Sequence, residues 1–225
     1  MKKTVSLLLV LMLSVTLLFA ETAGERNALN QAKRYLMFSP FSYEGLVEQL
    51  EFEGYTNAEA RYGADNCGAD WNEQAVLQAE RYLKFSAFSY SGLIEQLEFE
   101  GYTPDQAKYG VDHTKLGNSS SESTKDSSES TFSQQQALRS AQSYLKYTAF
   151  SRKGLIEQLE FEGYSTADAT YAADNCGADW NEQAYKSAQN YLKYSTFSYK
   201  GLIAQLEFEG FTSAQAKYGA DKAYK

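Results

Sequence analysis

Apolar residues in the first part of the chain recur at the spacing of a helix that buries one side. Within residues 27–38, Ala28, Ala32, Tyr35 and Leu36 stand at positions i, i+4, i+7 and i+8, which share one helical face. We therefore predict a first helix over residues 27–38.

A second helix is predicted directly afterwards. Pro40 disfavours helical geometry in the residue before it, and the side-chain oxygen of Ser42 can cap a new helix. This helix is expected over residues 43–53, and Gly54 ends it in the left-handed region. Its predicted buried residues are Tyr43, Leu46, Val47 and Leu50.

A short third helix is predicted over residues 57–64, with Ala60 and Tyr62 packing inward. Thr56 and Glu59 before it form a capping box, in which each side chain bonds the backbone N–H of the other residue. Equivalent boxes are predicted at Thr103 with Gln106 and at Thr212 with Gln215. The pattern therefore predicts a unit of three capped helices.

The unit occurs four times. Gln-Leu-Glu-Phe-Glu-Gly stands unchanged at 49–54, 96–101, 158–163 and 205–210. The matching tyrosines before it are separated by 47, 62 and 47 residues, which is the range of stacked helical repeats. The predicted repeats span residues 26–70, 71–114, 134–179 and 180–225.

The longer middle interval divides the four repeats into two pairs. Residues 115–133 are rich in serine and poor in apolar residues, so we predict a flexible tether there. Within each pair the joint is short, with Asp70 and Asp179 as caps and Trp71 and Trp180 expected to pack at the seam. The predicted fold class is all-α, with two pairs of three-helix, helix-turn-helix repeats joined by this linker.

Residues 1–20 have the pattern of a secretory signal peptide. Lys2 and Lys3 precede an apolar run, and Ala20 is the predicted cleavage position. The alternative is an uncleaved membrane anchor, because the run has about 17 apolar residues, which is the lower limit for a helix that spans a membrane. Cleavage leaves 19 basic and 29 acidic residues, a net charge of −10. We expect an acidic protein that is secreted or held at the cell surface.

Nucleic acid is not an expected partner. The second and third helices could be interpreted as a DNA-binding helix-turn-helix, but the acidic balance repels phosphate groups. The third helices offer only Arg61, Lys108 and Lys217, with Thr170 at the matching place in the remaining repeat.

The two cysteines, Cys67 and Cys176, occupy equivalent places in the first and third repeats. An even number of cysteines in an exported chain permits a disulfide, within one molecule or between two. A bridge between them would close a loop of about 109 residues and stabilise the fold by about 4–5 kcal/mol. Two partly buried free thiols are the alternative.

Each second helix ends on a phenylalanine between two glutamates. The candidate partner-binding residues are Glu48, Glu51, Phe52 and Glu53; Glu95, Glu98, Phe99 and Glu100; Glu157, Glu160, Phe161 and Glu162; and Glu207, Phe208 and Glu209. Glu48 and Phe52 lie within about 40° of each other on the helix, away from Leu46 and Leu50.

Two interpretations fit this pattern. The phenylalanine packs under the third helix or a neighbouring repeat, which stabilises the fold by about 1.5–3 kcal/mol and leaves the glutamates as a solvated rim. Alternatively, it is an aromatic anchor in an acidic surface that binds a basic or helical protein partner.

Nothing in the sequence predicts catalysis, a metal site or a cofactor. His113 is the only histidine, and we expect it in a solvated loop at the edge of the linker. Residues 65–70 lack the alternating oxygen ligands of a calcium loop, and no zinc spacing or phosphate-binding loop occurs.

Four motifs occur in order along the repeats: Tyr-Leu, Phe-Ser-x-x-Gly-Leu-x-x-Gln-Leu, Ala-x-Tyr-Gly-Ala-Asp and Ala-Asp-Trp-Asn-Glu-Gln-Ala. Together they resemble the Ltp-type host cell surface-exposed lipoprotein repeat of Gram-positive bacteria and their phages. The resemblance implies a three-helix unit displayed outside the membrane. In phage-encoded members it also implies superinfection exclusion, in which entry of incoming phage DNA is blocked. Residues 18–21, Leu-Phe-Ala-Glu, hold no cysteine for the acyl group that the family name implies.

We therefore expect an exported repeat protein that binds a protein partner at the cell envelope, such as a phage or host entry protein. The alternative is a secreted structural or adhesive module that binds a wall polymer or matrix through four similar faces.

Overall fold

The computed structural model describes residues 21–121 and 130–225, and every regular element within these ranges is an α-helix. The first repeat has α1 (Ala23–Phe38), α2 (Tyr43–Phe52) and α3 (Asn57–Asn66), and the second has α4 (Trp71–Phe85), α5 (Tyr90–Phe99) and α6 (Pro104–Asp112). After α7 (Lys115–Ser121), the third repeat has α8 (Phe132–Tyr147), α9 (Arg152–Phe161) and α10 (Thr166–Asn175). The fourth has α11 (Trp180–Tyr194), α12 (Tyr199–Phe208) and α13 (Ser213–Ala223). The all-α repeat fold is confirmed, and the predicted signal segment lies outside the described residues.

The second helix of each repeat begins at a serine and ends at a glycine, as the sequence predicts. The capping serines are Ser42, Ser89, Ser151 and Ser198, each accepting a hydrogen bond from the backbone N–H three residues later at 2.9–3.0 Å. The closing glycines, Gly54, Gly101, Gly163 and Gly210, have φ of +97°, +88°, +86° and +88°. Residues with a side chain rarely adopt this geometry, so glycine sets the sharp turn into the third helix.

Small residues allow the first and third helices of a repeat to approach closely. A Cβ added at Gly63 of α3 would lie 2.9 Å from backbone atoms of Ala28 in α1. Ala28 and Ala32 have no exposed surface, and Leu46 and Leu50 of α2 are also fully buried. Each repeat thus encloses a small core of its own.

An aromatic residue at the start of one repeat packs on the core of the repeat before it. Trp71 opens α4 but packs against the core of the first repeat, where its ring meets that of Tyr43 edge to face at 5.5 Å. Trp180 packs in the same way on the third repeat. The predicted place of both tryptophans at the seam is confirmed, and Phe132 of α8 has the same role on the second repeat.

The predicted linker differs from the structure at both ends. Residues 115–121 form α7, and Leu116 is completely buried in the core of the second repeat. Residues 132 and 133 already belong to α8, while residues 122–129 lie outside the described residues. The prediction relied on serine content and gave no weight to Leu116 at the margin.

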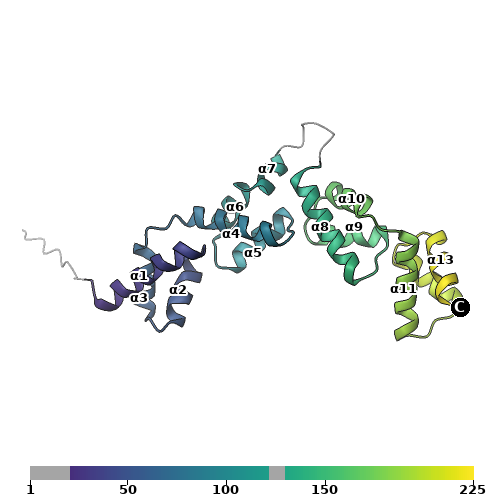
Figure 1. Ribbon diagram of the computed structural model, residues 1–225, viewed down its shortest axis with the longest axis horizontal. Helices are drawn as coiled ribbons and strands as arrows, with labels where there is room; N and C mark the ends of the chain where they lie inside the picture. Colours follow the sequence, from purple (N-terminus) through teal and green to yellow (C-terminus); the bar gives the residue numbers. More distant parts are fainter. Residues whose placement is uncertain (1–20, 122–129) are drawn as a thin grey trace, which may run out of the picture.

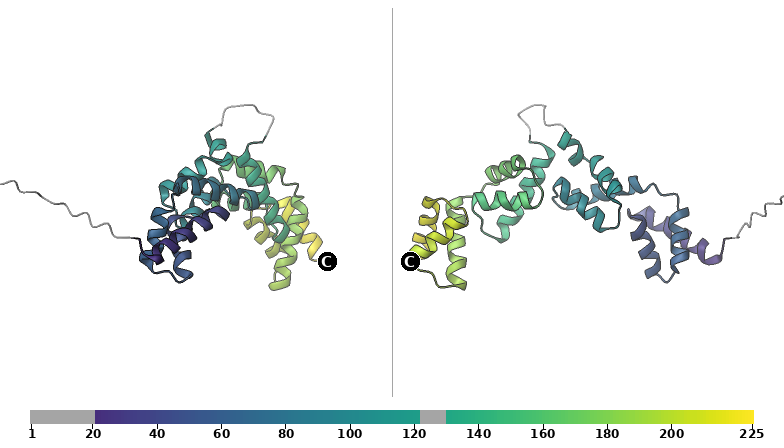
Figure 2. Two further views of the ribbon diagram at one scale, coloured as in Figure 1. Left: turned by 60° about the vertical axis from the view of Figure 1, so that its left-hand side comes forward. Right: turned by 180° about the vertical axis from the view of Figure 1, so that it is seen from behind.

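One hydrogen bond recurs at all three junctions between repeats. The capping serine donates its hydroxyl proton to the backbone carbonyl of the glutamate that follows the second helix of the next repeat. The pairs are Ser42 with Glu100 at 2.5 Å, Ser89 with Glu162, and Ser151 with Glu209 at 2.5 Å. The second and third repeats are therefore joined like the repeats within each predicted pair. Figures 1 and 2 show the four units following one another along a bent, elongated molecule.

Candidate partner-binding site

The four phenylalanines that end the second helices point into solvent. These repeat phenylalanines, Phe52, Phe99, Phe161 and Phe208, are 87%, 88%, 88% and 86% exposed. The interpretation that packed them under the third helix or a neighbouring repeat is therefore wrong. Their exposure agrees with the anchor interpretation, which requires the rings to be accessible.

The glutamates around these phenylalanines fall into two groups. The outer group, consisting of Glu48, Glu51, Glu95, Glu98, Glu157, Glu160 and Glu207, is exposed. Its members make few bonds, such as the one that Glu51 Oε1 accepts from Asn57 Nδ2 at 2.7 Å and the exposed ion pair of Glu157 with Lys153 at 3.3 Å. Each repeat phenylalanine is thus next to one or two solvated carboxylates.

The glutamate after each phenylalanine belongs to the fold instead. A tyrosine hydroxyl of the first helix donates to its carboxylate in every repeat, in the pairs Tyr35–Glu53, Tyr82–Glu100, Tyr144–Glu162 and Tyr191–Glu209. A glutamine of the second helix donates in turn to each tyrosine oxygen at 3.0–3.3 Å. We call these four residues the cap glutamates, and their assignment to a free acidic rim is corrected. Sequence reasoning missed the constant spacing of 18 residues between tyrosine and glutamate.

Burial perturbs one of these carboxyl groups. Glu162 lies at the junction of the second and third repeats, and desolvation there raises its pKa above the ordinary value, opposed by a hydrogen bond from Ser140. Burial also raises the pKa of the neighbouring Tyr164 hydroxyl, to about 12. Both groups belong to the hydrogen-bonded network of the third repeat, and both line the pocket between the second and third repeats.

A second row of exposed aromatic residues was not predicted. The residue that ends each first helix is aromatic and turned outward: Phe38 (84% exposed), Phe85 (72%), Tyr147 (87%) and Tyr194 (77%). Each stands two positions after the leucine of the Tyr-Leu pair, and this position lies outside the buried stripe of the helix. The position on the helix could therefore have predicted from sequence that these rings are exposed.

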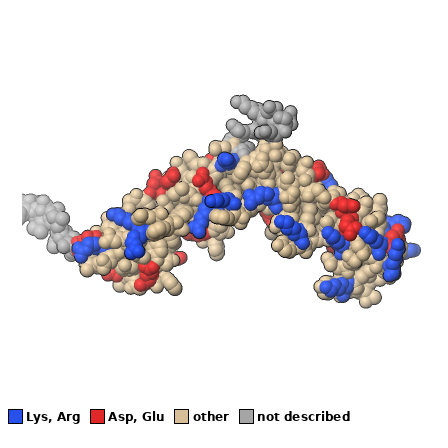
Figure 3. Space-filling model, viewed as in Figure 1, with Lys and Arg blue, Asp and Glu red and all other residues tan. Residues whose placement is uncertain are grey.

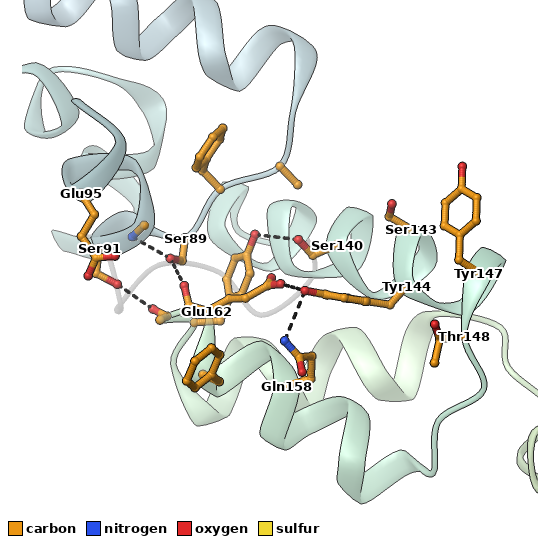
Figure 4. A pocket seen from close by; sticks show the side chains of 16 residues that line it. Ser89, Ser91, Glu95, Ser140, Ser143, Tyr144, Tyr147, Thr148, Gln158 and Glu162 are labelled. Carbon is orange, nitrogen blue, oxygen red and sulfur yellow. Dashed lines mark hydrogen bonds between the residues drawn. The ribbon is translucent and has the colours of Figure 1, made fainter. Parts of the chain in front are cut away.

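Open pockets lie at two of the junctions. The pocket between the first and second repeats, of about 540 Å³, includes Phe41, Arg81 and Phe85. The pocket between the second and third repeats, of about 890 Å³, includes Tyr147 and Phe161. Figure 4 shows Tyr144 directed at Glu162 inside the second pocket, whereas Tyr147 points away from them.

The two cysteines and the histidine singled out in the sequence make contacts within their own helices. Cys67 and Cys176 are free thiols, each bonded to a carbonyl oxygen of its own helix at 3.2 Å, so no bridge joins them. His113 ends α6, where its ring stacks on Tyr109 at 3.8 Å. Among the described residues, no cluster of three or more His, Cys, Asp or Glu could hold a metal ion.

Charge is distributed in small groups on the face shown in Figure 3, where most of the surface carries neither sign. No helix within residues 21–121 and 130–225 is long and apolar enough to cross a membrane. The scattered charge suits recognition by local contacts rather than by one large charged field.

The family model of the host cell surface-exposed lipoproteins matches the chain four times, at residues 24–67, 70–114, 133–176 and 179–222. Comparison with curated proteins and with solved structures finds no match. The matched segments cover the three helices of every repeat, apart from one end residue each of α1, α8 and α13, and make up well over half of the residues, so the chain belongs to the family of host cell surface-exposed lipoproteins.

Proposed function

We propose that this chain acts without catalysis, as an exported protein whose repeat phenylalanines anchor a protein partner at the cell envelope. The observation that carries the proposal is the near-complete exposure of the same side chain in all four repeats. The fold gains nothing from an apolar ring in water, whereas burial of one in a partner is worth about 1.5–3 kcal/mol.

The surroundings of each anchor suggest the chemistry of the partner. Outward glutamates such as Glu48 and Glu51 flank Phe52, so an apolar pocket with a basic rim would complement the site. Four equivalent anchors along one molecule also favour a partner that is repeated or clustered, because linked sites increase avidity.

A protein of the DNA-entry apparatus, of an incoming phage or of the host, is the partner that we propose on the basis of the family. The role would then be exclusion of a second phage, as the resemblance to phage-encoded members implies. Surface exposure is a family property and places the anchors where such a protein could be met.

The test is a phage challenge of a host that expresses the chain with residues 1–20. Wild type should reduce plaque numbers, and replacement of all four repeat phenylalanines by alanine should abolish protection. Because these rings are exposed, the variant should melt within a few degrees of wild type. The matched control replaces Phe38, Phe85, Tyr147 and Tyr194 by alanine, which removes four exposed rings elsewhere and should leave protection intact. Full protection by the first variant would contradict the anchor proposal.

A wall-binding adhesive role is the second candidate, favoured by the junction pockets. Phe85 and Tyr147 stand at their edges beside hydroxyl and carboxylate groups, an arrangement that suits sugar rings. Unchanged plaque numbers with wild type, together with binding of purified protein to isolated cell wall, would favour this role. The control variant above should then lose wall binding.

A further inference from the structure

We propose that the fourth repeat of one molecule binds the first repeat of a second copy, through the same junction that joins successive repeats within the chain. This inference does not depend on the partner proposed above. It starts from the two different halves of the internal junction.

One half of each junction is a donor and the other an acceptor. The donor half is the capping serine of the earlier repeat, and the three internal serines Ser42, Ser89 and Ser151 are only 2%, 3% and 1% exposed. The acceptor half is the cap-glutamate carbonyl of the later repeat with its closing glycine. At the first junction, a Cβ added to Gly101 would lie 3.0 Å from Ser42 Oγ. The two halves fit closely enough to require glycine.

Within residues 21–121 and 130–225, the first and fourth repeats each leave one half of a junction open. Ser198, the donor of the fourth repeat, is exposed. At the other end, Glu53 and Gly54 of the first repeat are exposed, and Tyr55 beside them is half-buried. The residues that match Tyr55 in later repeats, Tyr102, Tyr164 and Phe211, are only 3%, 5% and 4% exposed. The described repeats thus present one unused donor and one unused acceptor.

The side chains at the two ends also match. At the first internal junction Arg81 donates to Ser39 Oγ at 2.9 Å. The corresponding residues at the open ends are Arg34 in the first repeat and Ser195 in the fourth, so docking would recreate this pair. Docking would thus recreate this bond of the first internal junction, while Asn27 would stand in the place of Gln74, whose Oε1 accepts the Phe41 N–H at 3.4 Å there.

The aromatic packing at the junction is complementary as well. At the internal junctions, the first residue of the next repeat supplies the ring, for example Trp71 against Tyr43. In the fourth repeat Tyr224 of the same repeat supplies this ring, since it meets Tyr199 edge to face at 5.7 Å. The residue of the first repeat that matches Trp71 is Gly24, which supplies no ring of its own.

Charge favours the same pairing. Residues 21–69 hold eight acidic and four basic residues, a net charge of −4, whereas residues 179–225 hold five acidic and six basic residues, a net charge of +1. Lys200 occupies the place of Lys153, whose Cβ lies 3.0 Å from a Cβ added at Gly210. Docking would bring Lys200 beside Gly54 of the acidic first repeat.

Such an interface joins two different surfaces, so it does not close into a twofold dimer. Repetition of a head-to-tail contact produces chains or rings of molecules. Display of many copies on one cell surface would raise their local concentration and favour this growth.

The test uses residues 21–225, which contain all described helices, in sedimentation velocity from about 1 µM to about 1 mM, the range of weak and moderate interfaces. Ser198→Asp blocks the donor end, because aspartate retains the helix cap but sets a carboxylate against the carbonyl. Gly54→Asn blocks the acceptor end. Matched controls are Thr212→Asp at another exposed cap and Gly68→Asn, since a Cβ at Gly54 or Gly68 meets nothing within 4 Å in the single chain.

Wild type and both controls should grow beyond dimers with rising concentration, and each blocked variant should remain a monomer. An equimolar mixture of the two blocked variants should form one dimer and grow no further, since each retains the half that the other lacks. A monomeric wild type at about 1 mM, self-association of a blocked variant, loss of growth in the controls, or a monomeric mixture would each overturn the proposal.

Discussion

Replacement of Ser89 by alanine should destabilise the protein more than the same change at Ser198. Ser89 Oγ accepts the Gly92 N–H at 3.0 Å and donates to the Glu162 carbonyl across the middle junction. Loss of the cap costs about 1 kcal/mol. The part-buried carbonyl left without its donor costs a further ~1–3 kcal/mol, so Ser89→Ala should lower the free energy of unfolding by about 2–4 kcal/mol.

Ser198→Ala is the matched control, because Ser198 caps α12 through Gly201 at 3.0 Å but is not joined to a later repeat among the described residues. It should cost only the cap, about 1 kcal/mol. The difference between the two variants isolates the bond across the junction.

Urea unfolding followed by circular dichroism at 222 nm measures both variants. With a slope of about 2 kcal/mol per molar, the midpoint for Ser89→Ala should lie about 0.5–1.5 M below that for Ser198→Ala. Low protein concentration keeps self-association from adding stability. Equal midpoints would refute the reasoning, because they would show that the carbonyl of Glu162 does not depend on Ser89.

Three further predictions follow from single contacts. Because the pKa of Glu162 is raised, the folded state retains this proton to higher pH than the unfolded chain does. The free energy of unfolding should therefore fall as pH rises from about 4.5 through the folded pKa. Urea titrations at several pH values should show this fall in wild type and a flatter profile in Glu162→Gln. Leu116→Ala should cost about 2–5 kcal/mol in thermal unfolding, because its side chain is fully buried; a cost below 1 kcal/mol would contradict that packing. Cys67 and Cys176 should both react with a thiol reagent in the purified protein, whereas an unreactive pair whose gel mobility changes on reduction would show a bridge.

The helices and their ends could be predicted because their causes are local. The oxygen of Ser42 caps α2 through an N–H only three residues away, and the geometry of Gly54 follows from its missing side chain. The same serine also bonds Glu100, 58 residues later, and no periodicity encodes that contact. Local rules therefore gave the units but not the way in which they join.

The site shows the same limit. The helical angle placed Phe52 away from Leu46 and Leu50, but two outcomes remained because a neighbouring repeat could have covered it. The role of Glu53 was misjudged for a similar reason, since the hydroxyl that it binds belongs to Tyr35 on another helix. Leu116 was assigned to a linker on composition, although the core that buries it lies in the repeat before.

The continuous array can be tested directly by comparing amide spectra of residues 21–225 with those of the separate halves, residues 21–117 and 131–225. Continuity predicts that amide resonances of residues 89–92 and 162–164 shift when the halves are separated, while those in the first and fourth repeats stay in place. A spectrum of the whole chain equal to the sum of the two halves would contradict the middle junction, and with it the single array that presents the repeat phenylalanines.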